Sequence, residues 1–129
     1  LSYTYGLNGF LIPSKLPFLV DVIEAEAIIE EAALARQFGA DYVVLSLQWG
    51  NEYQHDPSSF QLELAEELLN DPNIDIIVGS HAHVIQPIGT VNDKPVIYGL
   101  GNFLSNLLKE LIDLVHWYFV QDLASLLSF

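Results

Sequence analysis

The fold is decided by residues 42–83, which read YVVLSLQWGNEYQHDPSSFQLELAEELLNDPNIDIIVGSHAH. The apolar runs at 42–47 and 74–79 are rich in β-branched residues, a composition typical of strands buried on both faces of a sheet. Between them, Asp56-Pro57 predicts a helix start, with Asp56 as the N-cap, and the helix runs to about Asn70. Strand, helix and strand in this order predict an α/β fold with a partly parallel sheet.

The flanking sequence extends this pattern in both directions. Residues 1–17 read as an ordered loop or a strand remnant, and Glu24 to Phe38 read as a helix with an apolar stripe. Further strands are expected at Phe18–Val22, Val84–Ile88 and Pro95–Tyr98, with a turn at Asn92-Asp93 and an apolar helix over 104–129.

Composition limits the class of protein. The 129 residues are 51% hydrophobic, enough for one domain with a core, and no apolar run reaches the length of a membrane span. The formal net charge of −13 disfavours nucleic acid and anionic membrane surfaces as partners. Without cysteine, disulfides, thiolate zinc sites and cysteine nucleophiles are excluded. Without methionine, residue 1 is not a translation start, and we expect a fragment of a longer chain.

Two loops follow the carboxyl ends of the buried strands, where ligands bind in open α/β sheets. The loop at 79–83 contains His81 and His83, and neutral imidazole is a common ligand of divalent metals. Gly79 would let the chain leave the strand sharply. The alternative is a surface turn that contains two histidines by chance. We expect this loop to lie beside the loop at 48–56.

The loop at 48–56 carries four side chains that could ligate a hard cation: Gln48, Glu52, His55 and Asp56. His55 or Asp56 could also act as a general base. The structural alternative is a capping Asp56, a solvated Glu52 and a His55 without a special role. Trp49 and Tyr53 are expected to pack rather than to stack on a ligand. Asn102, in a tight turn at 99–103, is a further polar candidate.

Four segments together resemble a known family: YTYGLNG (3–9), DYVVLSLQWGNEY (41–53), IIVGSHAHVIQPI (76–88) and KPVIYGLGNF (94–103). They are similar to the bacterial capsule synthesis protein CapA family, which is linked to poly-γ-glutamate capsules and belongs to the metallo-dependent phosphatase-like superfamily. The resemblance covers residues 1–105, as the C-terminal half of the family domain. Residues 106–129 form a divergent, amphipathic C-terminal helix in this interpretation.

The resemblance implies part of a four-layer α/β/β/α sandwich with a mixed sheet, an extra C-terminal helix and a two-metal cleft. His81 and His83 match the metal-binding histidines, and Gln48 stands where the family usually has a ligand histidine. By the same resemblance His81, Glu52 and Asn102 are catalytic candidates. The cofactor would be divalent Mn, Zn or Fe, with two ions in the intact domain. The half-domain that carries further ligands has no match in residues 1–40, so we expect the isolated chain to be inactive.

Two functions stay open at this point. The first is a CapA-like protein of poly-γ-glutamate capsule biosynthesis, resembling metal-dependent phosphoesterases. The alternative is a non-catalytic scaffold, or a truncated fragment of the fold, that binds a partner or polymer. Expected partners are the missing N-terminal half or another subunit, an acidic polymer only through cations, and a second copy through the C-terminal helix. The family implies the cell envelope or the extracellular face.

Overall fold

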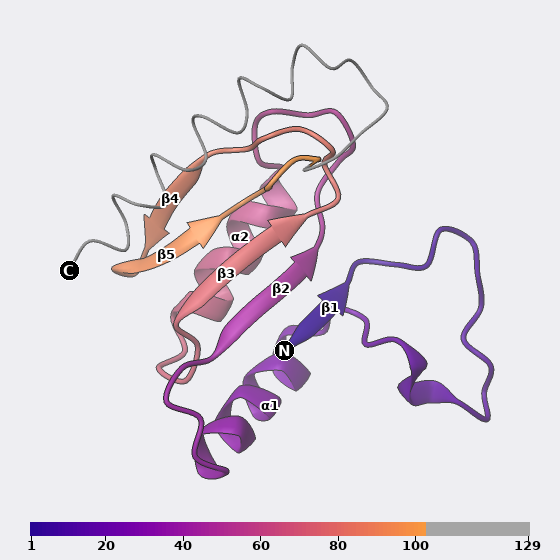
Figure 1. The fold of residues 1–129 in the computed structure, drawn as a ribbon, viewed down its shortest axis with the longest axis vertical. Helices are drawn as coiled ribbons and strands as arrows, with labels where there is room; N and C mark the ends of the chain where they lie inside the picture. Colours follow the sequence, from indigo (N-terminus) through magenta and orange to yellow (C-terminus); the bar gives the residue numbers. More distant parts are fainter. Residues whose placement is uncertain (103–129) are drawn as a thin grey trace.

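The computed structural model describes residues 1–102, which form a mixed five-stranded sheet with two α-helices (Figure 1). In chain order the elements are β1 (Ser2–Thr4), a 3-10 turn η1 (Pro17–Leu19), α1 (Ala25–Gln37), β2 (Val44–Gln48), α2 (Ser59–Leu69), β3 (Ile76–Ser80), β4 (Ile88–Val91) and β5 (Lys94–Ile97). The sheet order is β1-β2-β3-β5-β4. Every neighbouring pair is parallel except β4 with β5. The predicted α/β class is confirmed.

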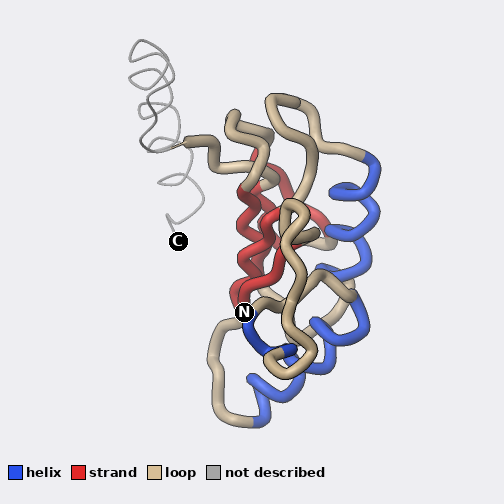
Figure 2. The backbone as a smooth tube through the Cα atoms, turned by 90° about the vertical axis from the view of Figure 1, so that its right-hand side faces the viewer, coloured by secondary structure: helices blue, strands red, loops and turns tan. Residues whose placement is uncertain are grey.

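Both α-helices lie on one face of the sheet, and among residues 1–102 no helix packs on the other face, which we call the open face (Figure 2). Along β2, Leu45 and Leu47 are fully buried against the helices, whereas Val44, Ser46 and Gln48 are exposed. The expectation that this strand is buried on both faces is therefore wrong. Its apolar composition is shared by strands of one-sided and two-sided sheets, and only the tertiary arrangement separates them.

The two helices begin differently. The first helix starts after Glu24 without a side-chain cap, and it packs Ile28 and Ala32 into the core. The second helix starts with a capping box, in which the Ser58 hydroxyl accepts from the Gln61 amide and the Gln61 side chain accepts from the Ser58 amide. Asp56 is therefore not the N-cap, because the first helical residue lies three positions further on.

Two of the other predicted strands also differ. Residues 18–22 form no strand, since Pro17–Leu19 is a 3-10 turn and only Val22 pairs, by one isolated bridge to Thr4. The strand predicted at Val84–Ile88 begins at Ile88 instead. The turn at Asn92-Asp93 is confirmed: both residues have positive φ (53° and 61°), as tight β4–β5 hairpin turns require.

The predicted helix over 104–129, with the domain boundary after residue 105, lies outside the described residues. Within residues 1–102, no helix combines the length and apolarity needed to cross a membrane.

Candidate functional site

The two candidate loops lie side by side, as expected, at the edge where β2 and β3 end. The Tyr53 amide donates to the Ala82 carbonyl oxygen at 2.7 Å. The His55 ring nitrogen Nδ1 lies 3.2 Å from the Ile85 carbonyl oxygen. This pairing brings Glu52 of the first loop next to His83 of the second.

His83 is the centre of the cluster at this edge. Its Nδ1 lies 2.9 Å from Oδ1 of Asn102, and its Nε2 lies 3.9 Å from Oε1 of Glu52. A carboxamide oxygen only accepts hydrogen bonds, so with Oδ1 on this side the contact matches the tautomer that carries its ring proton on Nδ1. The Nε2 lone pair then faces Glu52, with both side chains about half exposed. Imidazoles that ligate metals are oriented in this way by a partner on the other ring nitrogen.

His81 lies apart from this pair. Its ring centroid is 4.6 Å from that of Tyr5 and 6.2 Å from that of His83. Both histidines have positive φ, 98° for His81 and 60° for His83. Side-chain-bearing residues rarely adopt this conformation, and its presence at a candidate site is typical of functional loops.

The turn after β3 is thus made by the histidines and not by Gly79. That glycine lies inside the strand, where an added Cβ would meet the Tyr98 carbonyl oxygen at 2.0 Å and Trp49 Nε1 at 2.4 Å. Trp49 is fully buried and donates from Nε1 to the Tyr98 carbonyl oxygen at 2.9 Å. The prediction that Trp49 packs is confirmed, and the reason for the glycine is close packing.

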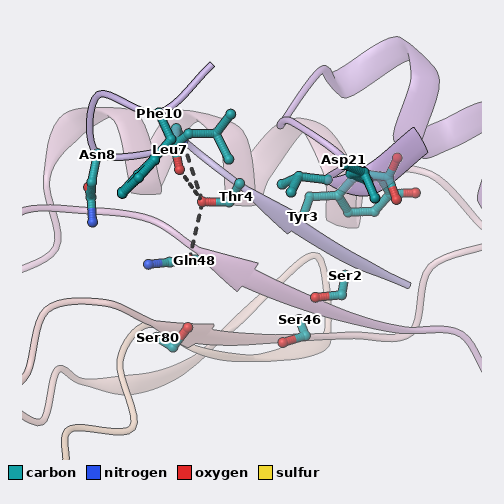
Figure 3. A pocket seen from close by; sticks show the side chains of 13 residues that line it. Ser2, Tyr3, Thr4, Leu7, Asn8, Phe10, Asp21, Ser46, Gln48 and Ser80 are labelled. Carbon is teal, nitrogen blue, oxygen red and sulfur yellow. Dashed lines mark hydrogen bonds between the residues drawn. The ribbon is translucent and has the colours of Figure 1, made fainter. Parts of the chain in front are cut away.

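Gln48 points onto the open face of the sheet and not toward His83. It lines a cavity of about 560 Å³ between the sheet and the 6–21 loop, with Thr4, Ser46 and Ser80 (Figure 3). Its Oε1 accepts from the Thr4 hydroxyl at 3.2 Å. In this geometry Gln48 is part of a polar cavity next to the loops.

Aromatic partners of the histidines were not predicted. Tyr53 is 60% exposed and stacks on His83, with ring centroids 5.6 Å apart. Tyr53 was expected to pack rather than to stack on a ligand; it is largely exposed, unlike Trp49, and its φ is positive at 61°. Tyr5, on the loop after β1, contacts His81 with its ring tilted by 44°. For the contact between Tyr53 and His83, the only signal in the sequence is that a tyrosine follows Glu52.

The remaining predicted residues take structural positions. Asp56 contributes its backbone carbonyl to the buried side chain of Gln86, and His55 contacts a backbone oxygen. Burial raises the pKa of the Tyr98 hydroxyl, which stays protonated beneath the site.

The donor set fits part of a divalent metal site. His83 and Glu52 supply a nitrogen and a carboxylate that face each other, and His81 supplies a second imidazole nearby. Across the described part of the chain, no three His, Asp or Glu side chains gather closely enough to hold an ion. Zinc sites in proteins use three or four protein ligands, so further ligands for such an ion would have to come from elsewhere.

A family model for bacterial capsule synthesis proteins, PGA_cap, matches residues 7–107. The chain belongs to the PGA_cap family. The match includes both loops of the site, with Glu52, His81, His83 and Asn102.

The chain is also similar to individual proteins. The chain is 46% identical over 97 residues to the PGA biosynthesis protein CapA of Bacillus subtilis (strain 168), covering 75% of this chain and 25% of that protein. It is 37% identical over 92 residues to the capsule biosynthesis protein CapA of Bacillus anthracis, covering 71% and 22%. A probable polyglutamine synthesis accessory protein of Mycobacterium tuberculosis (strain H37Rv) is 27% identical over 73 residues, covering 57% and 19%. The chain spans about a quarter or less of the length of these relatives.

Proposed function

We propose that this chain is part of a protein of poly-γ-glutamate capsule biosynthesis at the cell envelope. We propose further that the edge formed by its two loops supplies part of a divalent metal site. Membership of the PGA_cap family and the similarity to two CapA proteins support the first statement. The geometry around His83 supports the second.

The observation that carries the metal proposal is the pair of contacts made by His83. Asn102 holds Nδ1, which fixes both the tautomer and the direction of the ring. The free Nε2 faces the Glu52 carboxylate at 3.9 Å. Imidazole with carboxylate suits Mn, Fe or Zn.

In the longer protein, a bound divalent metal would polarise the oxygen of a phosphoester or related bond. His83 and Glu52 would bind the ion, and His81 would contribute from the other side of the turn. Asn102 would orient His83 and contact the substrate through its amide. The remaining ligands would come from another part of the protein or from a second subunit, and so the isolated chain would not turn over substrate.

The charge of the chain restricts how it meets an acidic polymer. With a formal net charge of −13, this chain repels polyglutamate. Contact between the two would therefore pass through cations, and the metal-binding edge is the place where we expect it.

Metal titration of the purified chain tests the proposal. We expect Zn²⁺ and Mn²⁺ to bind weakly by isothermal titration calorimetry, because only part of a ligand set is present. Binding should be lost in His83→Ala and kept in His55→Ala. His55 is a matched control, since it lies on the same edge but contacts a backbone oxygen.

The cellular test uses the host gene with the same two substitutions. His83→Ala should lower the capsular glutamate released by acid hydrolysis, and His55→Ala should not. Equal metal binding by both variants, or a capsule unaffected by His83→Ala, would contradict the proposal.

A further inference from the structure

Two glutamine side chains are buried directly beneath the loops that carry Glu52 and His83. Gln61, on α2, has no exposed surface, and Gln86, in the loop after β3, is 1% exposed. Burying a carboxamide is unfavourable unless its donors and acceptor are paired. Within residues 1–102 every buried side-chain nitrogen and oxygen has a partner.

Gln61 joins the helix to the sheet. Its Nε2 donates to Gln86 Oε1 at 2.7 Å and to the Tyr98 carbonyl oxygen at 3.3 Å. Its Oε1 accepts from the Ser58 amide at 3.0 Å, as part of the capping box. The same side chain thus starts the helix and holds Gln86.

Gln86 joins the two loops. Its Nε2 donates to the carbonyl oxygens of Gln54 at 2.9 Å and Asp56 at 3.4 Å. Its backbone amide donates to the Gly99 carbonyl oxygen at 3.0 Å. Gln86 follows His83 by three residues, and its hydrogen bond to the Gln54 carbonyl oxygen reaches the other loop two residues after Glu52. It therefore links the segments that carry the two proposed ligands.

Two glycines leave the space that these carboxamides occupy. A Cβ at Gly50 would lie 2.5 Å from Gln61 Oε1, and a Cβ at Gly99 would lie 2.9 Å from Gln86 Oε1. Real Cβ atoms do not approach other atoms so closely. The backbone on both sides is thus shaped around this pair of glutamines.

We propose that Gln61 and Gln86 are positioning residues that set the spacing of Glu52 and His83. This inference rests on the proposed metal-binding function of that edge. On the outer side the loops are held by the hydrogen bond from the Tyr53 amide to the Ala82 carbonyl oxygen. Without Gln86 as a donor, the carbonyl oxygens of Gln54 and Asp56 lose their hydrogen bonds, and the loop with Glu52 can move relative to His83.

The test compares Gln86→Met, the double variant Gln61→Met/Gln86→Met and the exposed control Gln37→Met in the full chain. Methionine keeps the length of the side chain but donates no hydrogen bond. Zn²⁺ affinity is followed by the imidazole resonances of His83, and the loop is followed by hydrogen exchange of the Tyr53 amide without metal. We expect Gln86→Met to weaken Zn²⁺ binding about tenfold and to speed Tyr53 exchange about tenfold.

The double variant removes the Gln61 amide that Gln86→Met would leave without its acceptor. It also loses the capping-box contact of Gln61 with the Ser58 amide, and the carbonyl oxygens of Gln54 and Asp56 stay unpaired as in the single variant. We expect its stability against urea to be close to that of Gln86→Met, and Zn²⁺ affinity and Tyr53 protection to stay low in both. If Gln86→Met does not fold, Zn²⁺ affinity and Tyr53 amide exchange are measured in the double variant instead. Ile28→Val, a core change in α1, is the control for stability loss alone.

Unchanged Tyr53 exchange in folded Gln86→Met or in the double variant would overturn the inference. The same holds if Ile28→Val weakens Zn²⁺ binding as much as Gln86→Met does. If the unsubstituted chain binds no Zn²⁺, the proposed function fails, and Tyr53 exchange still decides whether the glutamines position the loop.

Discussion

The state of a single imidazole, His83, depends on one amide oxygen. Asn102 Oδ1 lies 2.9 Å from Nδ1 and leaves Nε2 directed at Glu52. A neutral imidazole in solution exchanges between two tautomers, whereas this contact selects one. The metal binding that we propose for this edge would thus depend on the neutral Asn102 as well as on the ligands.

Asn102→Ala should release this tautomer. We expect the ¹⁵N shifts of His83 in the neutral ring to move toward a mixture of the Nδ1–H and Nε2–H forms, and Zn²⁺ affinity to fall about tenfold. Asn70→Ala, at the exposed end of α2, should change neither. A ring that keeps its Nδ1 proton in Asn102→Ala would show that Asn102 does not select the tautomer.

Tyr3 predicts how stability depends on pH. Burial, and then its 2.6 Å hydrogen bond to Glu31 Oε2, raise the pKa of Tyr3 far above the ordinary value. A raised pKa in the folded state stabilises the fold fully below the unfolded pKa of about 10, and the benefit is lost as pH rises above it. Tyr3→Phe should therefore reduce the loss of stability between about pH 8 and about pH 11.

Urea unfolding at those two pH values measures the effect. Exposed Tyr42→Phe is the control. Part of the pH dependence should survive in Tyr3→Phe, because burial also raises the pKa of Tyr98. An equal loss of stability in Tyr3→Phe and the unsubstituted chain would exclude Tyr3 as a contributor.

Among the elements, β3 is the one that we expect to tolerate substitutions least. It lies centrally in the sheet, and its Gly79 is covered by Trp49 and the backbone of Tyr98. Gly79→Ala should lower the free energy of unfolding by at least about 2 kcal/mol, because neither neighbour is a flexible side-chain end. Gly89→Ala, on β4 with open space around it, should change it little. Chemical denaturation of both variants measures the difference, and equal midpoints would refute the packing argument.

How much of the fold the sequence predicts depends on the range of the interactions. The helix at 24–38, the two central strands and the Asn92-Asp93 turn follow from local patterns, and the structure has all of them. Burial on both faces of the sheet was predicted wrongly, because it depends on whether a second layer is present. Asp56 and Ser58 are both good caps, and only Gln61, three residues after Ser58, distinguishes them.

In the candidate site, too, local patterns predict one part of the arrangement and long-range contacts determine the rest. The pattern of strand ends predicted that the two loops lie side by side, but it did not single out Glu52 and His83 as neighbours. It did not predict Gln48 turned to Thr4, Tyr53 stacked on His83, or Gln86 between the loops. Each of these depends on side-chain directions that are set by positive φ angles and by contacts distant in sequence.

At the scale of the whole molecule, the main feature of residues 1–102 is the open face of the sheet, on which none of their helices packs (Figure 2). It exposes Val44, which is 44% accessible, at the start of β2, and Ser46 and Gln48 follow on the same face. The described residues thus have one helix layer and one sheet layer of the four that the family resemblance implies. A sheet with one uncovered face tends to acquire a cover from another chain.

Association of the chain should therefore depend on concentration. We expect sedimentation velocity to show dimers or larger species as concentration rises, and Val44→Lys to reduce them. Leu34→Lys, an equally exposed position on the outer side of α1, is the control for added charge. A monomer at every concentration, or equal effects of the two substitutions, would argue against the open face as the contact.

The left-handed backbone at His81 has a consequence for selection. With φ at 98°, this position would suit glycine better than any residue with a side chain. A change to glycine would relax the turn and stabilise the chain while removing an imidazole that we propose contributes to metal binding. Selection for folding alone would thus move this position away from histidine.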